Sequence, residues 1–245
     1  MKYKQITIAL LGNIIKSYIK KELKMNQKLT ALYNSKWNSL IANAKDTDAT
    51  YPLLIKVNDE YQNADIKVMI VGQETDGWCG VLEENKRDIN SVQETYFNYL
   101  YNKSKDKNRR PFWNRKNFKY FQEELKKKFS SKKVAFIWNN VSKIGMNYSG
   151  EATEKVKNLE KEYFNVFEDE LKILKPDIII FTIGNRTIPM KYKQNEIIEK
   201  MPISEINFLD YQNIVAVKTY HPNAKIKGGK KEFNKEIINF IVSKI

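Results

Sequence analysis

Short apolar runs alternate with longer amphipathic segments along most of the chain, and this pattern predicts strands that alternate with helices. Four runs are rich in Val and Ile and are bounded by Gly, Pro or Asn, which is typical of strands buried on both faces of a parallel sheet. They read IKVMIVG, KVAFIWN, PDIIIFTIG and NIVAVKTYH, at residues 66–72, 133–139, 176–184 and 213–221.

The segments between these runs repeat their apolar residues every three or four positions, which is the spacing of an amphipathic helix. Residues 117–129 and 158–174 each place a line of aromatic and aliphatic side chains on one face, and residues 232–245 do so after the last strand. Strands that alternate with helices indicate an α/β fold. We expect a three-layer α/β/α sandwich around a central, mainly parallel four-stranded sheet.

The first sixty residues do not show this alternation and are predicted to form a helical extension packed on the core. Residues 6–15 (ITIALLGNII) are too short to cross a bilayer and are not followed by a small-residue cleavage site, so an amphipathic helix is favoured. Trp37 and Ile41 then share a face at helical spacing. The expected organisation is an extension at residues 1–60 followed by one α/β/α domain at residues 61–245.

Composition adds a strong positive charge to an otherwise ordinary globular balance. The 245 residues include 43 Lys and Arg against 29 Asp and Glu, a formal net charge of +14. This excess favours a polyanionic partner through release of phosphate counterions, although a genome that encodes lysine freely is an alternative explanation. The single cysteine, Cys79, excludes an intramolecular disulfide, and the chain has no Cys/His cluster for zinc. We expect a cytoplasmic monomer with no metal, no cofactor and no membrane attachment.

Polar residues follow the predicted strands at the edge of the sheet where α/β proteins bind their ligands. Glu74 and Asp76 follow the first strand, and Asn139 and Asn140 close the second. Residues 184–186 (Gly-Asn-Arg) follow the third, and His221, the only histidine, follows the last. A carboxylate orients water or stabilises a cation, an amide reads the edge of a base, and a histidine donates a hydrogen bond or transfers a proton. A lone histidine is also often structural.

The order of these residues resembles the uracil-DNA glycosylase superfamily. That family has a Gly-Gln-Asp-Pro-Tyr motif after its first core strand, an Asn at the end of a later strand, and a His-Pro-Ser motif after the last. The matching positions here are residues 72–74 (Gly-Gln-Glu), Asn139, and residues 221–223 (His-Pro-Asn). The resemblance covers about residues 66–241. It implies a metal-independent hydrolase that cleaves the N-glycosidic bond of a uracil or modified base flipped out of single- or double-stranded DNA.

The resemblance also implies a role for each matching residue. Glu74 would activate water, with Asp76 as the nearby substitute, and His221 would stabilise negative charge on the leaving base. Asn139 would read the base edge, and Trp78 offers a face for stacking, although a core indole is the alternative. The residues expected around the base are Gly72, Gln73, Trp78, Asn139 and Asn223.

Three features depart from the family pattern. Glu replaces Asp at position 74, which moves the carboxylate by about one bond length. The segment TDGW replaces Pro-Tyr-His, so the tyrosine that excludes bulkier bases is missing. Lys225, followed by Ile226, takes the place of the apolar wedge that enters the duplex. These changes favour a different or modified base, or a relative that binds DNA or nucleotides without cleavage. An enzyme acting on free nucleotides is a third alternative.

Two basic segments are candidate DNA contacts. Residues 225–231 (KIKGGKK) place lysines around two glycines, which let backbone amides approach a phosphate, unless this is an ordinary solvated loop. Residues 109–113 place cations beside aromatic rings, which suits a single strand, unless the rings fix the start of the next helix. The expected contacts are Lys225, Ile226, Lys227, Lys230, Lys231, Arg109 and Arg110.

Overall fold

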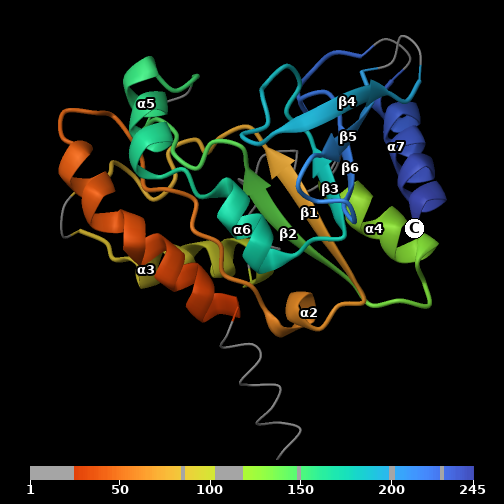
Figure 1. The fold of residues 1–245 in the computed structure, drawn as a ribbon, viewed down its shortest axis with the longest axis horizontal. Coiled ribbons are helices and arrows are strands. Elements are labelled where there is room, and N and C mark those ends of the chain that lie inside the picture. The colour runs from red at the N-terminus through yellow and green to blue at the C-terminus, as the bar shows by residue number, and fades with distance from the viewer. Residues whose placement is uncertain (1–24, 84–85, 103–117, 148–149, 199–201, 227–228) are drawn as a thin grey trace, which may run out of the picture.

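The protein has an α/β fold built around one six-stranded mixed sheet (Figure 1). This computed structural model describes residues 25–83, 86–102, 118–147, 150–198, 202–226 and 229–245. The strand order is β2-β1-β3-β6-β5-β4. Strands β2, β1, β3 and β6 run parallel, whereas β5 pairs antiparallel with β6 and β4 pairs antiparallel with β5.

The four parallel strands lie where the apolar runs predicted strands. Their bounds are β1 (Ile66–Gly72), β2 (Val134–Asn140), β3 (Ile178–Phe181) and β6 (Val215–Lys218). The expected number of four strands was wrong, because the sheet also contains β4 (Tyr192–Glu196) and β5 (Ser204–Phe208). An apolar run marks a strand that is buried on both faces. Most of β4 is exposed and β5 is buried only at alternate positions, so neither strand carries that signal.

Helices cover both sides of the sheet. Helices α4 and α7 lie on one side, and α6 lies on the other with a helix formed by residues 25–43 (Figure 1). The bounds are α2 (Asp59–Gln62), α3 (Ile89–Phe97) with the π-helical turn η1 (Asn98–Asn102), α4 (Phe118–Lys128), α5 (Glu154–Tyr163), α6 (Phe167–Leu174) and α7 (Lys230–Lys244).

The single helix expected at residues 158–174 is in fact two helices, α5 and α6. The backbone leaves the helical region at Phe164, where φ is −140° and ψ is 32°. Phe164, Val166 and Phe167 are all at most 1% exposed. In a continuous helix Val166 would point about 160° away from Phe164 around the helix axis. The break between α5 and α6 therefore lets all three enter the core.

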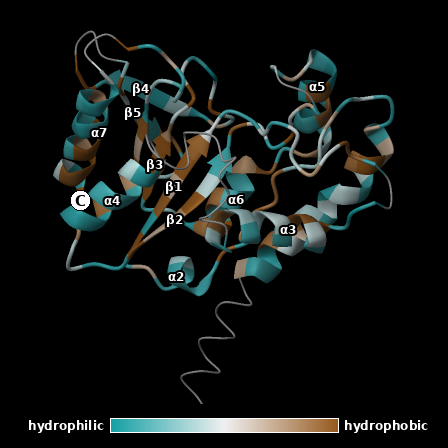
Figure 2. Ribbon diagram, turned by 180° about the vertical axis from the view of Figure 1, so that it is seen from behind, coloured by the Kyte–Doolittle hydropathy of each residue, from teal (hydrophilic) through white to brown (hydrophobic). Residues whose placement is uncertain are grey.

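The described part of the predicted N-terminal extension is built into the core. Leu29, Tyr33 and Leu40 of the 25–43 helix and Leu53 after it are fully buried. They belong to the same core cluster as the side chains of the hydrophobic strands, which Figure 2 shows in brown. The apolar segment at residues 6–15 lies outside the described residues. Among the helices that the structure describes, none has the length and apolar character needed to cross a bilayer.

Candidate functional site

The segments that follow β1, β3 and β6 meet at one edge of the sheet. Gln73 follows β1 directly, and its side-chain Nε2 donates a hydrogen bond to the main-chain oxygen of Ile183, at 2.8 Å. Gly184 has a φ of +59°, and a Cβ at this position would lie 3.4 Å from the His221 nitrogen and 4.0 Å from Gln73 Nε2. The tight turn at Gly184 therefore brings two of the predicted site residues, Gln73 and His221, close together.

Glu74 is the more shielded of the two candidate carboxylates, since its side chain is only 13% exposed. Its Oε1 lies 3.1 Å from Arg186 Nη2, and its Oε2 accepts a hydrogen bond from the Ala152 N–H at 3.4 Å. Burial raises the pKa of Glu74 above its usual value of 4.5, and the positive charge of Arg186 partly opposes this rise. Asp76 is exposed, and its main chain forms a bridge to Met146.

Arg186 was expected at a strand end, but no role in the site was predicted for it. Its guanidinium binds Glu74 through Nη2 and Glu151 Oε1 through Nη1, the latter at 3.0 Å. Its charge also acts on His221, so the guanidinium lies within electrostatic reach of both proposed catalytic groups. The only signal in the sequence is its place two residues after Gly184, because the contact with Glu74 spans 112 positions of the chain.

His221 is half-buried and has a defined tautomer. Its Nδ1 accepts a hydrogen bond from the Asn223 N–H at 3.3 Å, so the proton of the neutral ring lies on Nε2. Burial lowers the pKa of His221 below its usual 6.5, and the charges of Lys230 and Arg186 lower it further. At neutral pH the side chain is therefore an uncharged imidazole with Nε2–H as a hydrogen-bond donor. The contact from Asn223 comes from its main chain, and its side chain is exposed.

Trp78 belongs to an aromatic cluster beside the end of β1. Its ring meets Trp138 edge-on at a centroid distance of 5.6 Å and Tyr99 in the same way at 5.4 Å. Trp78 is only 9% exposed, yet its Nε1–H has no hydrogen-bond partner among the described residues. The indole is therefore both a packed side chain and a buried donor without an acceptor.

Asn140 holds a second donor of this kind. Its Oδ1 accepts a hydrogen bond from Trp138 Nε1 at 2.9 Å. Because an indole N–H can only donate, the amide must turn its oxygen toward Trp138 and its Nδ2 away from it. Asn140 is 1% exposed, and its Nδ2 has no partner in the described part of the chain. Gly72 leaves space for this amide, since a Cβ there would lie 2.6 Å from Asn140 Oδ1.

Asn139, the predicted base reader, has its amide fully engaged inside the protein. Its Oδ1 accepts from Lys143 Nζ at 2.6 Å, and its Nδ2 donates to Glu170 Oε2 at 2.9 Å. Lys143 and Glu170 form an ion pair at 2.9 Å with side chains at most 1% exposed, and Tyr33 donates to Glu170 at 2.7 Å. This network ties β2 and α6 to the 25–43 helix. Asn139 was the predicted base reader, but the amide with an unpaired donor belongs to Asn140.

The residues of the basic segment after His221 differ in their exposure and contacts. Lys225 and Lys231 are exposed, as expected for phosphate contacts, whereas Ile226 packs against the core. Lys230 donates a hydrogen bond from Nζ to the main-chain oxygen of Pro222, so it holds the turn that carries His221. The remaining candidates, Lys227, Arg109 and Arg110, lie outside the described residues.

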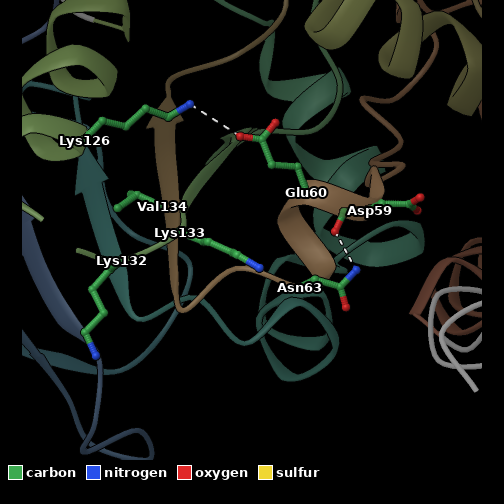
Figure 3. A pocket seen from close by; sticks show the side chains of 7 residues that line it. All are labelled: Asp59, Glu60, Asn63, Lys126, Lys132, Lys133 and Val134. Carbon is green, nitrogen blue, oxygen red and sulfur yellow. Dashed lines mark hydrogen bonds and ion pairs between the residues drawn. The ribbon is translucent and has the colours of Figure 1, made fainter. Parts of the chain in front are cut away.

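A separate cavity of about 460 Å³ lies at the start of β2, at the opposite end of the parallel strands from the site (Figure 3). The acidic side chains come from α2, whereas the lysines come from α4 and the segment before β2, and Glu60 pairs with Lys126 at 3.4 Å. It contains none of the residues predicted for function. The lining residues are Asp59, Glu60, Asn63, Lys126, Lys132, Lys133 and Val134.

The fold and the site together define an α/β protein with a shielded polar site at the carboxyl ends of its parallel strands. The described residues contain no group of three or more His, Cys, Asp or Glu side chains arranged to hold a metal ion. Comparison of the chain with protein-family models, with curated proteins and with solved structures gave no match.

Proposed function

We propose that the protein is a DNA glycosylase that hydrolyses the N-glycosidic bond of a flipped-out uracil or modified base. The observation that carries this proposal is that the segments bearing Glu74 and His221 meet at one edge of the sheet, where Gly184 lies close to both Gln73 and His221 and Arg186 contacts Glu74. In this proposal the four parallel strands form the glycosylase-like core of an α/β/α sandwich, and the β4–β5 hairpin extends it.

The chemistry of glycosidic cleavage suits these two groups. As the C–N bond breaks, the sugar becomes cationic and the base becomes anionic, so an anion beside the sugar and a donor beside the base both stabilise the transition state. Glu74 supplies the carboxylate, held from both sides by Arg186 and the Ala152 N–H. His221 supplies a neutral Nε2–H donor. The base must first leave the stack, at a cost of about a few kcal/mol.

The buried donors without acceptors give the proposed base site its specificity. A buried N–H that lacks an acceptor costs about 1–3 kcal/mol, and Trp78 Nε1 and Asn140 Nδ2 both lack one. A base that turns carbonyl oxygens toward them relieves this cost, whereas an amino group would add a third donor. The proposal therefore gives base reading to Asn140 in place of Asn139 and favours oxo bases over amino bases.

A second function is favoured by the ion pair of Glu74. Arg186 lies 3.1 Å from the carboxylate, and its charge offsets the negative charge that a cationic sugar requires. The same site would then bind an extruded base or a nucleotide without cleaving it. This reader would retain the base specificity but would lack hydrolytic activity.

Release of free base distinguishes the two functions. Oligonucleotides that contain uracil, hypoxanthine, xanthine or modified cytosines are incubated with wild type and with Glu74→Gln, and released bases are identified by mass spectrometry. Glu154→Gln, at an exposed position of α5, is the charge-matched control. We expect release by the wild type and the control, with a loss on the order of 10²-fold or more in Glu74→Gln. Binding of these oligonucleotides by a folded wild type without any release would contradict the glycosylase and support the reader.

A further inference from the structure

Arg186 holds two carboxylates that differ greatly in exposure. On its inner side, Nη2 contacts Glu74, whose side chain is 13% exposed. On its outer side, Nη1 contacts Glu151 at 3.0 Å, and the Glu151 side chain is 58% exposed. The guanidinium is itself 24% exposed, so it is reachable from solvent on the side of Glu151.

Glu151 has another cation to pair with. Its Oε1 also lies 2.8 Å from Lys157 Nζ, and Lys157 in turn contacts Glu154 at 2.9 Å. Exposed ion pairs of this kind contribute little, about 0–1 kcal/mol. Glu151 therefore loses little when it leaves Arg186, whereas Glu74 is fixed by burial and by the Ala152 N–H.

We propose that Arg186 binds a backbone phosphate beside the extruded nucleotide, and that Glu151 occupies this position in the free protein. A guanidinium N–H forms a strong, charge-assisted hydrogen bond with a phosphate oxygen. A phosphate oxygen at Nη1 displaces Glu151 toward Lys157, while Nη2 keeps its contact with Glu74. The sugar joined to that phosphate is then positioned next to the Glu74 carboxylate. The inference rests on the proposed function in that it takes nucleic acid as the ligand of this site.

The test measures affinity for ordinary single- and double-stranded oligonucleotides by fluorescence anisotropy, with folding of each variant checked by thermal unfolding. Glu151→Gln removes the displaced carboxylate, and Glu154→Gln makes the same charge change at a residue that contacts Lys157 but not Arg186. We expect Glu151→Gln to bind DNA about two- to fivefold more tightly than Glu154→Gln. Arg186→Ala should weaken binding by about 10- to 100-fold.

A double variant keeps the test decisive where Arg186→Ala alone disturbs the site. In the Arg186→Ala background, Glu151→Gln should bind DNA no more tightly than Glu154→Gln, because Glu151 no longer competes with a phosphate for the Arg186 guanidinium. Equal DNA affinities of Glu151→Gln and Glu154→Gln in protein that retains Arg186 would overturn the inference. Tighter DNA binding by Glu151→Gln that persists in the Arg186→Ala protein would overturn it too. Base release by the same variants from the oligonucleotides that contain uracil, hypoxanthine, xanthine or modified cytosines separates the two claims. Coupling of Glu151 to Arg186 without release would overturn the glycosylase and leave the phosphate site standing.

Discussion

Asn139 and Asn140 are consecutive residues of β2, and their side chains lie on opposite faces of the sheet in contrasting surroundings. On the Asn139 face, Asn139, Lys143, Glu170 and Tyr33 satisfy one another in a closed network. On the Asn140 face, Asn140 and Trp78 each keep a buried donor without an acceptor. The same residue type therefore joins a closed network at one position and keeps an unpaired buried donor at the next.

The largest expected loss of stability follows from removing the buried cation, Lys143, from the network on the Asn139 face. Lys143→Met leaves the Glu170 carboxylate buried without its cation and should lower the free energy of unfolding by about 3–5 kcal/mol. Chemical denaturation measures this loss. The double variant Lys143→Met, Glu170→Gln should recover a substantial part of it, because no uncompensated charge remains. A single-variant loss below about 1 kcal/mol would mean that the network does not stabilise the fold.

The next-largest effect is the difference in unfolding free energy between variants of Asn139 and Asn140. Asn139→Leu removes partners from both Lys143 and Glu170 and should cost about 1–3 kcal/mol of unfolding free energy. Asn140→Leu removes one unpaired donor but also takes the acceptor of Trp138 Nε1, so the two contributions offset and stability changes by less than about 1 kcal/mol. Urea unfolding of both variants checks the contrast. Equal losses would remove the distinction between the two faces.

A smaller effect is a pH dependence from Glu160, which accepts hydrogen bonds from the N–H groups of Lys143 and Ile144 next to the Asn139 face. Burial raises the pKa of Glu160 from 4.5 to about 7, in spite of these bonds. Between pH 4.5 and about 7, Glu160 therefore holds a proton more often in the folded state than in the unfolded state. Its stabilising contribution is complete below pH 4.5 and is lost as the pH rises through about 7. Unfolding of wild type and Glu160→Gln at several pH values should show this slope only in the wild type.

The smallest effect concerns the titration of His221, which NMR can follow cleanly because the chain has one histidine. Its midpoint should lie below 6.5, and Arg186→Ala should raise it by removing a nearby positive charge. The stability contribution of His221 changes with pH in the opposite direction to that of Glu160. The contribution of His221 is present above pH 6.5 and is lost as the pH falls through the lowered pKa. A midpoint that is unchanged in Arg186→Ala would place the guanidinium out of reach of the imidazole.

The sequence was sufficient for the features that depend on local pattern. β1 lies at the predicted residues 66–72, because a strand buried on both faces is a continuous apolar run. β4 was missed because an exposed edge strand of polar residues shows no such run. The other features that the sequence did not predict depend on the contacts of each side chain in three dimensions. Arg186 reaches a partner 112 positions away, and the difference between Asn139 and Asn140 rests on a shift of one residue, which reverses the face of the sheet.

The most direct test of the Asn140 face as a base site is the NMR signal of the Trp78 indole N–H. Glu74→Gln protein, which we expect to leave the DNA uncleaved, is mixed with an oligonucleotide containing one deoxyuridine or with the same oligonucleotide containing deoxycytidine. We expect a downfield shift of the Trp78 Nε1–H with deoxyuridine, because the donor gains an acceptor. The shift should be smaller with deoxycytidine and absent in Asn140→Leu. A Trp78 signal that does not move when deoxyuridine DNA saturates the protein would contradict the account.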